Sequence, residues 1–185
     1  MGPPGSGKGT QGERLAARFG IPAISTGDIF RANLATDTEL GRLAKSYMSK
    51  GEYVPDDVTN SMVRDRLAAD DTATGFLLDG YPRTSSQVEE LDGMLAAADQ
   101  RLDLVVQLTV DTEELVSRLL QRAHEQGRED DTEVTVRTRQ AVYAAQTEPL
   151  IDLYAARGLV LAVDGLGDMD LVAKRIRDAI DAFLG

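Results

Sequence analysis

Residues 2–10 read Gly2-Pro3-Pro4-Gly5-Ser6-Gly7-Lys8-Gly9-Thr10 and fit the pattern G-x-x-x-x-G-K. In such a loop, glycines let consecutive backbone N–H groups converge on a polyphosphate while a lysine neutralises its oxygens. A helix is predicted to follow at once, over residues 9–19, and its positive end would face the same phosphates. The alternative interpretation of these residues is an ordinary Gly/Pro-rich surface loop without a ligand. The stretch therefore predicts a phosphate-binding site.

One position departs from the general pattern of such loops. Gly9 stands where a serine or threonine usually coordinates magnesium, and the first hydroxyl comes one place later, at Thr10. In this respect GPPGSGKGTQ resembles the nucleoside monophosphate kinases, which carry the same glycine.

Composition limits the classes of function that are compatible with this sequence. With 185 residues and no Pro/Ser/Gly-rich linker or repeat, we expect a single domain over residues 1–185. The net charge of −11 argues against nucleic acid or an anionic membrane as a partner. The sequence has no cysteine and one histidine, which excludes disulfides and the usual zinc clusters. With no signal peptide and no apolar run of about 20 residues, we expect a cytoplasmic protein.

Short apolar runs alternate with longer helical patterns along the chain. The predicted strands, too apolar to have a solvated face, are residues 23–25, 75–79, 104–110 and 159–163. The predicted helices are residues 9–19, 27–34, 39–50, 56–69, 85–99, 112–122, 132–157 and 168–183, with Asp56 and Thr112 as candidate N-caps. This alternation predicts an α/β fold, with a parallel sheet, helices on both of its faces and ligands at the carboxyl ends of its strands.

A second motif ends one of the predicted strands. It reads Gly75-Phe76-Leu77-Leu78-Asp79-Gly80-Tyr81-Pro82-Arg83. Asp79 can hold the water shell of a Mg²⁺ ion that bridges two phosphates. Gly80 permits a close backbone approach, and Pro82 fixes the turn, so that Arg83 can point at a phosphate. An ordinary Asp-Gly turn with a solvated arginine would explain this motif alone, but not its pairing with the phosphate loop.

Three ordered motifs give a specific family resemblance: GPPGSGKGTQ, then Ser25-Thr26-Gly27-Asp28-Ile29-Phe30-Arg31, then DGYPR. Together they resemble the adenylate kinase family, over essentially the whole chain from Gly2 onward. The resemblance implies a P-loop NTPase-like fold and the reaction Mg-ATP + AMP ⇌ 2 ADP, with ATP, AMP and ADP as ligands and Mg²⁺ as cofactor. It implies that ATP contacts Gly5, Ser6, Gly7, Lys8, Gly9, Thr10, Arg118, Arg122 and Gly167. It implies that AMP contacts Thr26, Arg31, Glu52, Tyr53, Val54, Gly80, Tyr81, Pro82, Arg83, Gln87, Arg128 and Arg139.

The resemblance also implies two closing segments and a set of catalytic cations. An AMP-binding flap would span residues 25–54, and a short lid over ATP would span residues 121–131. The catalytic residues would be Lys8, Arg83, Arg122, Arg128 and Arg139, with Asp79 holding magnesium through water. Such a reaction needs neither a protein nucleophile nor a general base, because the AMP phosphate is already an anion. Catalysis then depends on cations that align two phosphates which repel each other.

The position of the phosphate loop raises a question about the sheet. Members of this family begin with five or six apolar residues that form a central strand, whereas only Met1 precedes the loop here. Adjacent strands lie about 4.8 Å apart, so removing a central one leaves its neighbours about twice that distance apart unless they move. Three alternatives are open. Strands 75–79 and 104–110 pair directly, another segment or a neighbouring molecule fills the space, or the sequence is a shortened one.

Other functions remain open at this point. A UMP/CMP kinase shares the loop and the strand-end motif, but Gln87, four residues after Arg83, favours adenine. A nucleotide-binding protein with little or no turnover would result if the loop were not held in place. We expect a monomer, and the missing strand leaves a swapped or associated form as the alternative.

Overall fold

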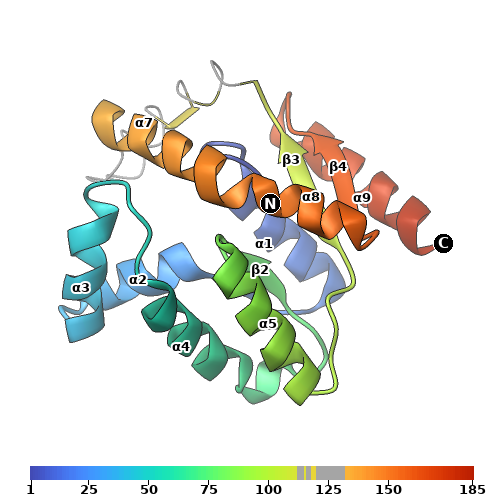
Figure 1. Cartoon of the computed structure of the whole chain (residues 1–185). Helices are drawn as coiled ribbons and strands as arrows, with labels where there is room; N and C mark the ends of the chain where they lie inside the picture. Colours follow the sequence, from blue (N-terminus) through green and yellow to red (C-terminus); the bar gives the residue numbers. More distant parts are fainter. Residues whose placement is uncertain (112–114, 116–117, 120–131) are drawn as a thin grey trace.

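Helices surround short parallel strands in this chain (Figure 1). The structure is a computed structural model, and it describes residues 1–111, 115, 118–119 and 132–185. The strands are β1 (Ala23–Ser25), β2 (Leu77–Asp79), β3 (Val105–Thr109) and β4 (Val160–Asp164). The helices are α1 (Lys8–Phe19), α2 (Thr26–Ala35), α3 (Glu39–Met48), α4 (Asp56–Leu67), α5 (Ser85–Ala97), α7 (Glu133–Val142), α8 (Pro149–Ala156) and α9 (Met169–Leu184), with shorter turns at η1 (Asp70–Thr72) and η2 (Tyr143–Thr147). None of the helices in these described ranges is long and apolar enough to cross a membrane.

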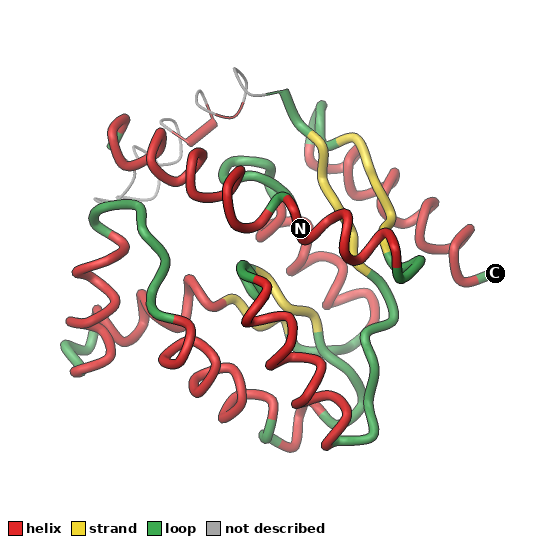
Figure 2. The backbone as a smooth tube through the Cα atoms, viewed as in Figure 1, coloured by secondary structure: helices red, strands yellow, loops and turns green. Residues whose placement is uncertain are grey.

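The strands form two parallel pairs (Figure 2). β1 lies beside β2, with Ile24 opposite Leu78, and β3 lies beside β4, with Gln107 opposite Ala162. The predicted α/β class with parallel strands is confirmed, and β1 has the predicted bounds. Direct pairing of β2 with β3, one of the alternatives for the missing strand, is not found among the described residues.

The backbone of Met1 lies beside β3, on the edge that β4 does not use. The Met1 α-amino group donates to the Val106 carbonyl, and the Leu108 N–H donates to the Met1 carbonyl at 2.9 Å. Alternate residues of a strand direct their backbone groups to opposite neighbours, and the Val105 N–H accordingly donates to Leu159 on the β4 side. Met1 therefore pairs with β3 as a parallel strand would and leads the chain from there into the phosphate loop.

The buried amine of Met1 predicts a pH-dependent stability for a chain that begins at this residue. The pKa of this amine is lowered from 8.0 to about 6, chiefly by burial and also by the positive charge of Lys8, while the negative charge of Asp79 acts in the opposite direction. Between pH 6 and 8 the unfolded chain therefore binds more protons at this site than the folded chain does. The free energy of unfolding is expected to rise as pH increases through this window, by about 2 to 3 kcal/mol from this group.

Urea unfolding at several pH values between 5 and 9 measures this dependence. The matched control is the same chain with Met1 acetylated, since the difference between the two chains cancels every other titrating group. A difference that stays constant from pH 6 to pH 8 would contradict a buried, titrating amine.

Side-chain oxygens fix the starts of five helices. The capping residues, each accepting from a backbone N–H of the first turn, are Ser25, Thr38, Thr84, Thr132 and Asp168, for α2, α3, α5, α7 and α9. The prediction of Asp56 as an N-cap is wrong, because Pro55 holds that position in α4 and Asp56 is the first helical residue. The Asp56 carboxylate instead accepts from the hydroxyl of Thr84 and the side-chain amide of Gln87, at 2.7 and 2.6 Å. The other predicted cap, Thr112, lies outside the described residues.

The single helix predicted over residues 132–157 is divided by a π-helical turn. In η2 the Glu148 N–H donates to the Tyr143 carbonyl at 2.9 Å, which is a bond across five residues. Pro149 follows and has no N–H with which to continue an α-helical ladder, and its ring would crowd the carbonyl four residues before it. The wider turn removes that conflict. Most of the helix predicted over residues 112–122 lies outside the described residues.

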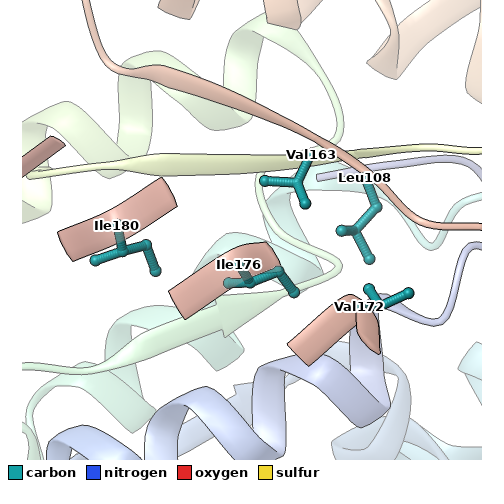
Figure 3. Packing of buried hydrophobic residues seen from close by; sticks show 5 residues of the cluster. All are labelled: Leu108, Val163, Val172, Ile176 and Ile180. Carbon is teal, nitrogen blue, oxygen red and sulfur yellow. The ribbon is translucent and has the colours of Figure 1, made fainter. Parts of the chain in front are cut away.

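The core beneath β3 and β4 is formed by α9 (Figure 3). Val172, Ile176 and Ile180 recur every four residues on this helix and pack against Leu108 and Val163 of the two strands. All five side chains are at most 5% exposed. A second cluster joins α4 to α5, and a third joins α2 to α3. The strand ends, where the phosphate loop and Asp79 lie, are therefore supported from several sides.

Candidate functional site

The phosphate loop depends on glycines at two turns. Gly7 has a φ of 84° and forms the N-cap of α1, and Gly5 has a φ of 90°. A Cβ atom at Gly5 would lie 2.8 Å from the Leu115 carbonyl oxygen, so a larger residue is excluded by contact as well as by conformation. The N-terminus of α1, which is the positive end of the helix dipole, therefore lies at the cavity described below.

Hydrogen bonds hold the loop against α7 and fold its lysine inward. The Lys8 ammonium donates to the Pro3 carbonyl at 3.3 Å, and the Gln140 side-chain amide donates to the Pro4 carbonyl at 2.9 Å. The Ser6 N–H closes a turn on Pro3 at 3.1 Å. The loop thus has a defined shape although only one residue of strand pairing precedes it.

Asp79 ends β2 next to the start of α1. A Cβ atom at Gly9 would lie 3.4 Å from an Asp79 carboxylate oxygen. The Asp79 carboxylate therefore lies in contact range of the first turn of the helix that carries Lys8. The arrangement places an anionic oxygen ligand within the same cavity as the phosphate loop.

Arg83 is held by its own loop and by an aromatic ring. Its Nε donates to the Gly80 carbonyl at 2.7 Å, and its guanidinium lies 4.8 Å from the centroid of the Tyr53 ring. Gly80 has a φ of 79°, and a Cβ there would lie 2.7 Å from the Arg83 guanidinium and 2.8 Å from the Thr26 hydroxyl. Burial lowers the pKa of Arg83, and the positive charges of Arg139 and Arg31 act in the same direction. The guanidinium is therefore a partly desolvated cation near two others.

A single cavity brings the phosphate loop and three arginines together. We call it the central cavity; Lys8, Arg31, Arg83 and Arg139 all line it. These cations come from α1, α2, the loop after β2, and α7, so no local stretch of sequence assembles them. Positive charge gathered in one cavity of a protein with a net charge of −11 indicates a polyanionic ligand.

The comparisons with known proteins agree with this geometry. The sequence model of the adenylate kinase family matches residues 1–159. The chain is 61% identical to an adenylate kinase of a Nocardioides species over 181 residues. This match covers 98% of this chain and 95% of the relative. It is 59% identical to an adenylate kinase of Kocuria rhizophila and 57% identical to one of Pseudarthrobacter chlorophenolicus, with 98% of this chain covered in each case.

This chain belongs to the adenylate kinase family. The family resemblance inferred from the three motifs is thereby confirmed, and the UMP/CMP kinase alternative is not favoured.

The structure gathers most of the residues that the adenylate kinase resemblance indicated. Those that line the central cavity are Gly5, Lys8, Thr26, Arg31, Glu52, Tyr53, Val54, Asp79, Gly80, Tyr81, Pro82, Arg83, Gln87 and Arg139. Those placed elsewhere around the loop and the end of β4 are Ser6, Gly7, Gly9, Thr10, Arg118 and Gly167. Arg118 donates to the Gly165 carbonyl at 3.3 Å, two residues before Gly167. Arg122, Arg128 and the predicted lid over residues 121–131 lie outside the described residues.

Two residues that hold predicted cavity residues in place were not assigned this role from the sequence. Asp56 orients the Gln87 amide, whose Nε2 donates to Asp56 at 2.6 Å while its Oε1 accepts the Arg83 N–H at 2.7 Å. Thr147, in the π-helical turn, donates to the Arg83 carbonyl at 2.9 Å and lines the cavity. The only local signal for Thr147 is Pro149, which breaks the α-helical ladder nearby.

Proposed function

We propose that the central cavity transfers the terminal phosphoryl group of Mg-ATP to AMP and yields two ADP. The observation that carries the proposal is the position of Lys8 and three arginines around one cavity, at the carboxyl end of β2. The phosphate loop would hold the ATP phosphates, and the arginines would hold the AMP phosphate. The flap over residues 25–54 and the lid over residues 121–131 would close on the two nucleotides.

On the donor side, backbone N–H groups of the phosphate loop and the ammonium of Lys8 would bind the ATP phosphates. The N-terminus of α1 adds the positive end of the helix dipole at the same place. These donors are fixed before the substrate arrives, because the loop is held by bonds to Pro3 and Pro4. Fixed donors stabilise the charge that develops on the transferred group at little reorganisation cost.

The residues around Asp79 fit a magnesium ion that is carried by the nucleotide. Among the described residues, no three His, Cys, Asp or Glu side chains gather as a metal site. Magnesium is commonly held by one or two carboxylates together with waters and substrate phosphates, and Asp79 supplies one such carboxylate in the central cavity. When bound, the ion neutralises charge on the ATP phosphate oxygens.

On the acceptor side, Arg31, Arg83 and Arg139 would bind and orient the AMP phosphate. An oxygen of this phosphate forms a bond to the γ-phosphorus, and the bond from that phosphorus to the β–γ bridging oxygen breaks, which releases ADP. No proton has to leave the attacking oxygen, so the residues need only align the two groups and exclude water. Gln87, with its amide fixed by Asp56, would contact the adenine of AMP.

Formation of ADP from ATP and each of AMP, CMP and UMP tests the proposal. We expect AMP to be preferred by kcat/KM over the two pyrimidine nucleotides by about a hundred-fold, since the base contact is made by a single oriented amide in a shaped cavity. Dependence of the rate on added Mg²⁺ is read in the same assay. Equal rates with all three acceptors, or ATP consumption that does not depend on an acceptor, would overturn the proposal.

A further inference from the structure

Three segments of the chain meet at the hydroxyl of Thr147. The Tyr53 hydroxyl lies 2.8 Å from Thr147 Oγ1, and Thr147 Oγ1 donates to the Arg83 carbonyl at 2.9 Å. The threonine has one hydroxyl proton, and a carbonyl can only accept. The Tyr53 hydroxyl is therefore the donor in the first bond, and the hydrogen bonds run in one direction, from Tyr53 through Thr147 to Arg83.

The aromatic ring of Tyr53 makes a further contact, with the Arg83 guanidinium, so that Tyr53, Thr147 and Arg83 each contact the other two. Its face covers the Arg83 guanidinium at 4.8 Å, while its hydroxyl is held by Thr147. Arg83 is thus contacted twice, at its carbonyl by Thr147 and at its guanidinium by the ring that Thr147 holds. Thr147 is 6% exposed, so bulk water has little access with which to replace its hydroxyl.

The π-helical turn explains why a threonine can serve this role here. Successive residues of an α-helix are rotated by about 100°, and a π-helical turn inserts one additional residue into the ladder. Thr147 ends this turn, just before the Pro149 that the turn accommodates. An uninterrupted α-helix would direct the side chain at this position elsewhere.

The segment that carries Tyr53 also contacts α7, the helix before the turn. The Thr135 hydroxyl donates to the Ser49 carbonyl at 3.3 Å. A Cβ atom at Gly51 would lie 2.8 Å from the Thr135 carbonyl oxygen, so the backbone approaches α7 closely at that point. Residues 49–53 therefore lie along α7 and η2, and the Tyr53–Thr147 bond is the contact nearest to Arg83.

We propose that Thr147 is a positioning residue for the acceptor phosphate. By holding Tyr53 and the Arg83 carbonyl at once, it sets the place of the Arg83 guanidinium and joins the acceptor segment to the helices that follow the predicted lid. The inference rests on the proposed function, in which Arg83 binds the AMP phosphate. Thr147 touches no reacting atom. Its two partners, Tyr53 and Arg83, lie on the proposed AMP side of the cavity, so we expect its replacement to affect AMP rather than ATP.

The test compares Thr147→Val with Thr147→Ser. Valine keeps the shape and removes the hydroxyl, which leaves the Arg83 carbonyl and the Tyr53 hydroxyl without their partner. We expect the KM for AMP to rise about five- to ten-fold, as for the loss of one or two neutral hydrogen bonds, while the KM for ATP stays within about two-fold. Serine retains the hydroxyl and is expected to restore most of the AMP affinity.

Thr72→Val is the matched control. Thr72 is also buried, at 3% exposed, and its hydroxyl also donates to backbone carbonyls, but it does not line the central cavity. This variant is expected to lose thermal stability and to keep both KM values. Tyr53→Phe removes only the bond to Thr147 and leaves the Thr147 hydroxyl free to donate to the Arg83 carbonyl, so it is expected to raise the KM for AMP less than Thr147→Val does. The double variant is expected to add little to Thr147→Val, because that variant already removes the bond to Tyr53.

Several outcomes decide the inference. An AMP KM for Thr147→Val equal to that of Thr72→Val would overturn it, and so would an equal rise in the KM values for AMP and ATP. Calorimetric titration with AMP alone separates this inference from the proposed reaction. If the unmodified protein forms no ADP but Thr147→Val still weakens AMP binding relative to Thr147→Ser, the proposed reaction fails and the positioning role is supported.

Discussion

Replacing Lys8 by methionine is expected to lower kcat for ADP formation by about a thousand-fold or more. Methionine has a similar length but carries no charge, so the ammonium proposed to bind the ATP phosphates is lost while the loop keeps its volume. In the transition state charge is spread over the oxygens of the transferred group and develops on the leaving oxygen, and removing one preorganised cationic donor typically costs two to three orders of magnitude or more in rate. Coupled measurement of ADP at saturating ATP and AMP reads this effect directly.

The fold is expected to survive this substitution. Lys8 makes a 3.3 Å bond to Pro3, whereas the shape of the loop also depends on the Ser6 and Gln140 bonds and on the glycine turns. Lys174→Met is the matched control, since Lys174 is an exposed lysine on α9 paired with Asp178. Its kcat should equal that of the unmodified protein. Turnover by Lys8→Met close to that of the control would exclude the phosphate loop as the ATP site.

The phosphate loop and the strands could be predicted because each is determined by adjacent residues. The loop follows from glycines at the turns and a lysine at the first helical position. The strands follow from short apolar runs, and β1 has the bounds that were predicted. The division into two strand pairs could not be predicted, since it depends on whether β2 or Met1 occupies the edge of β3, and the composition of β3 is compatible with both.

The residues that sequence reasoning missed act through contacts between distant segments. Asp56 has the local signature of an N-cap, but its carboxylate bonds to Thr84 and Gln87 across the space between α4 and α5. Thr147 is one of several threonines in a helical pattern, and its hydroxyl has a role because Tyr53 and the Arg83 carbonyl, from distant segments, lie beside it. Motif residues are identified from sequence because their chemistry is local, whereas the residues that position them depend on tertiary packing.

Replacing Arg83 by alanine is expected to lower kcat/KM for AMP by about a thousand-fold and to change the KM for ATP little. Arg83 lies under the Tyr53 ring and close to Arg31 and Arg139, so its loss removes one of the three arginines proposed to hold the acceptor phosphate, and the one that is fixed by the ring. The Gly80 carbonyl keeps a donor in this variant, because the Thr26 hydroxyl also donates to it, at 3.0 Å. The loop after β2 should therefore remain folded.

Lysine at position 83 should recover only part of the lost rate. It restores the positive charge but not the planar fork, the bond from Nε to Gly80 or the stacking on Tyr53. Arg157→Ala is the matched control: this arginine also lies over a tyrosine ring, that of Tyr154 at 5.4 Å, but it pairs with Asp92 and does not line the central cavity. Equal losses in the Arg83 and Arg157 variants would mean that removing any stacked arginine impairs the protein. A loss confined to Arg83 and to AMP would place the acceptor phosphate at its guanidinium, since the control shares the stacking and lacks the cavity.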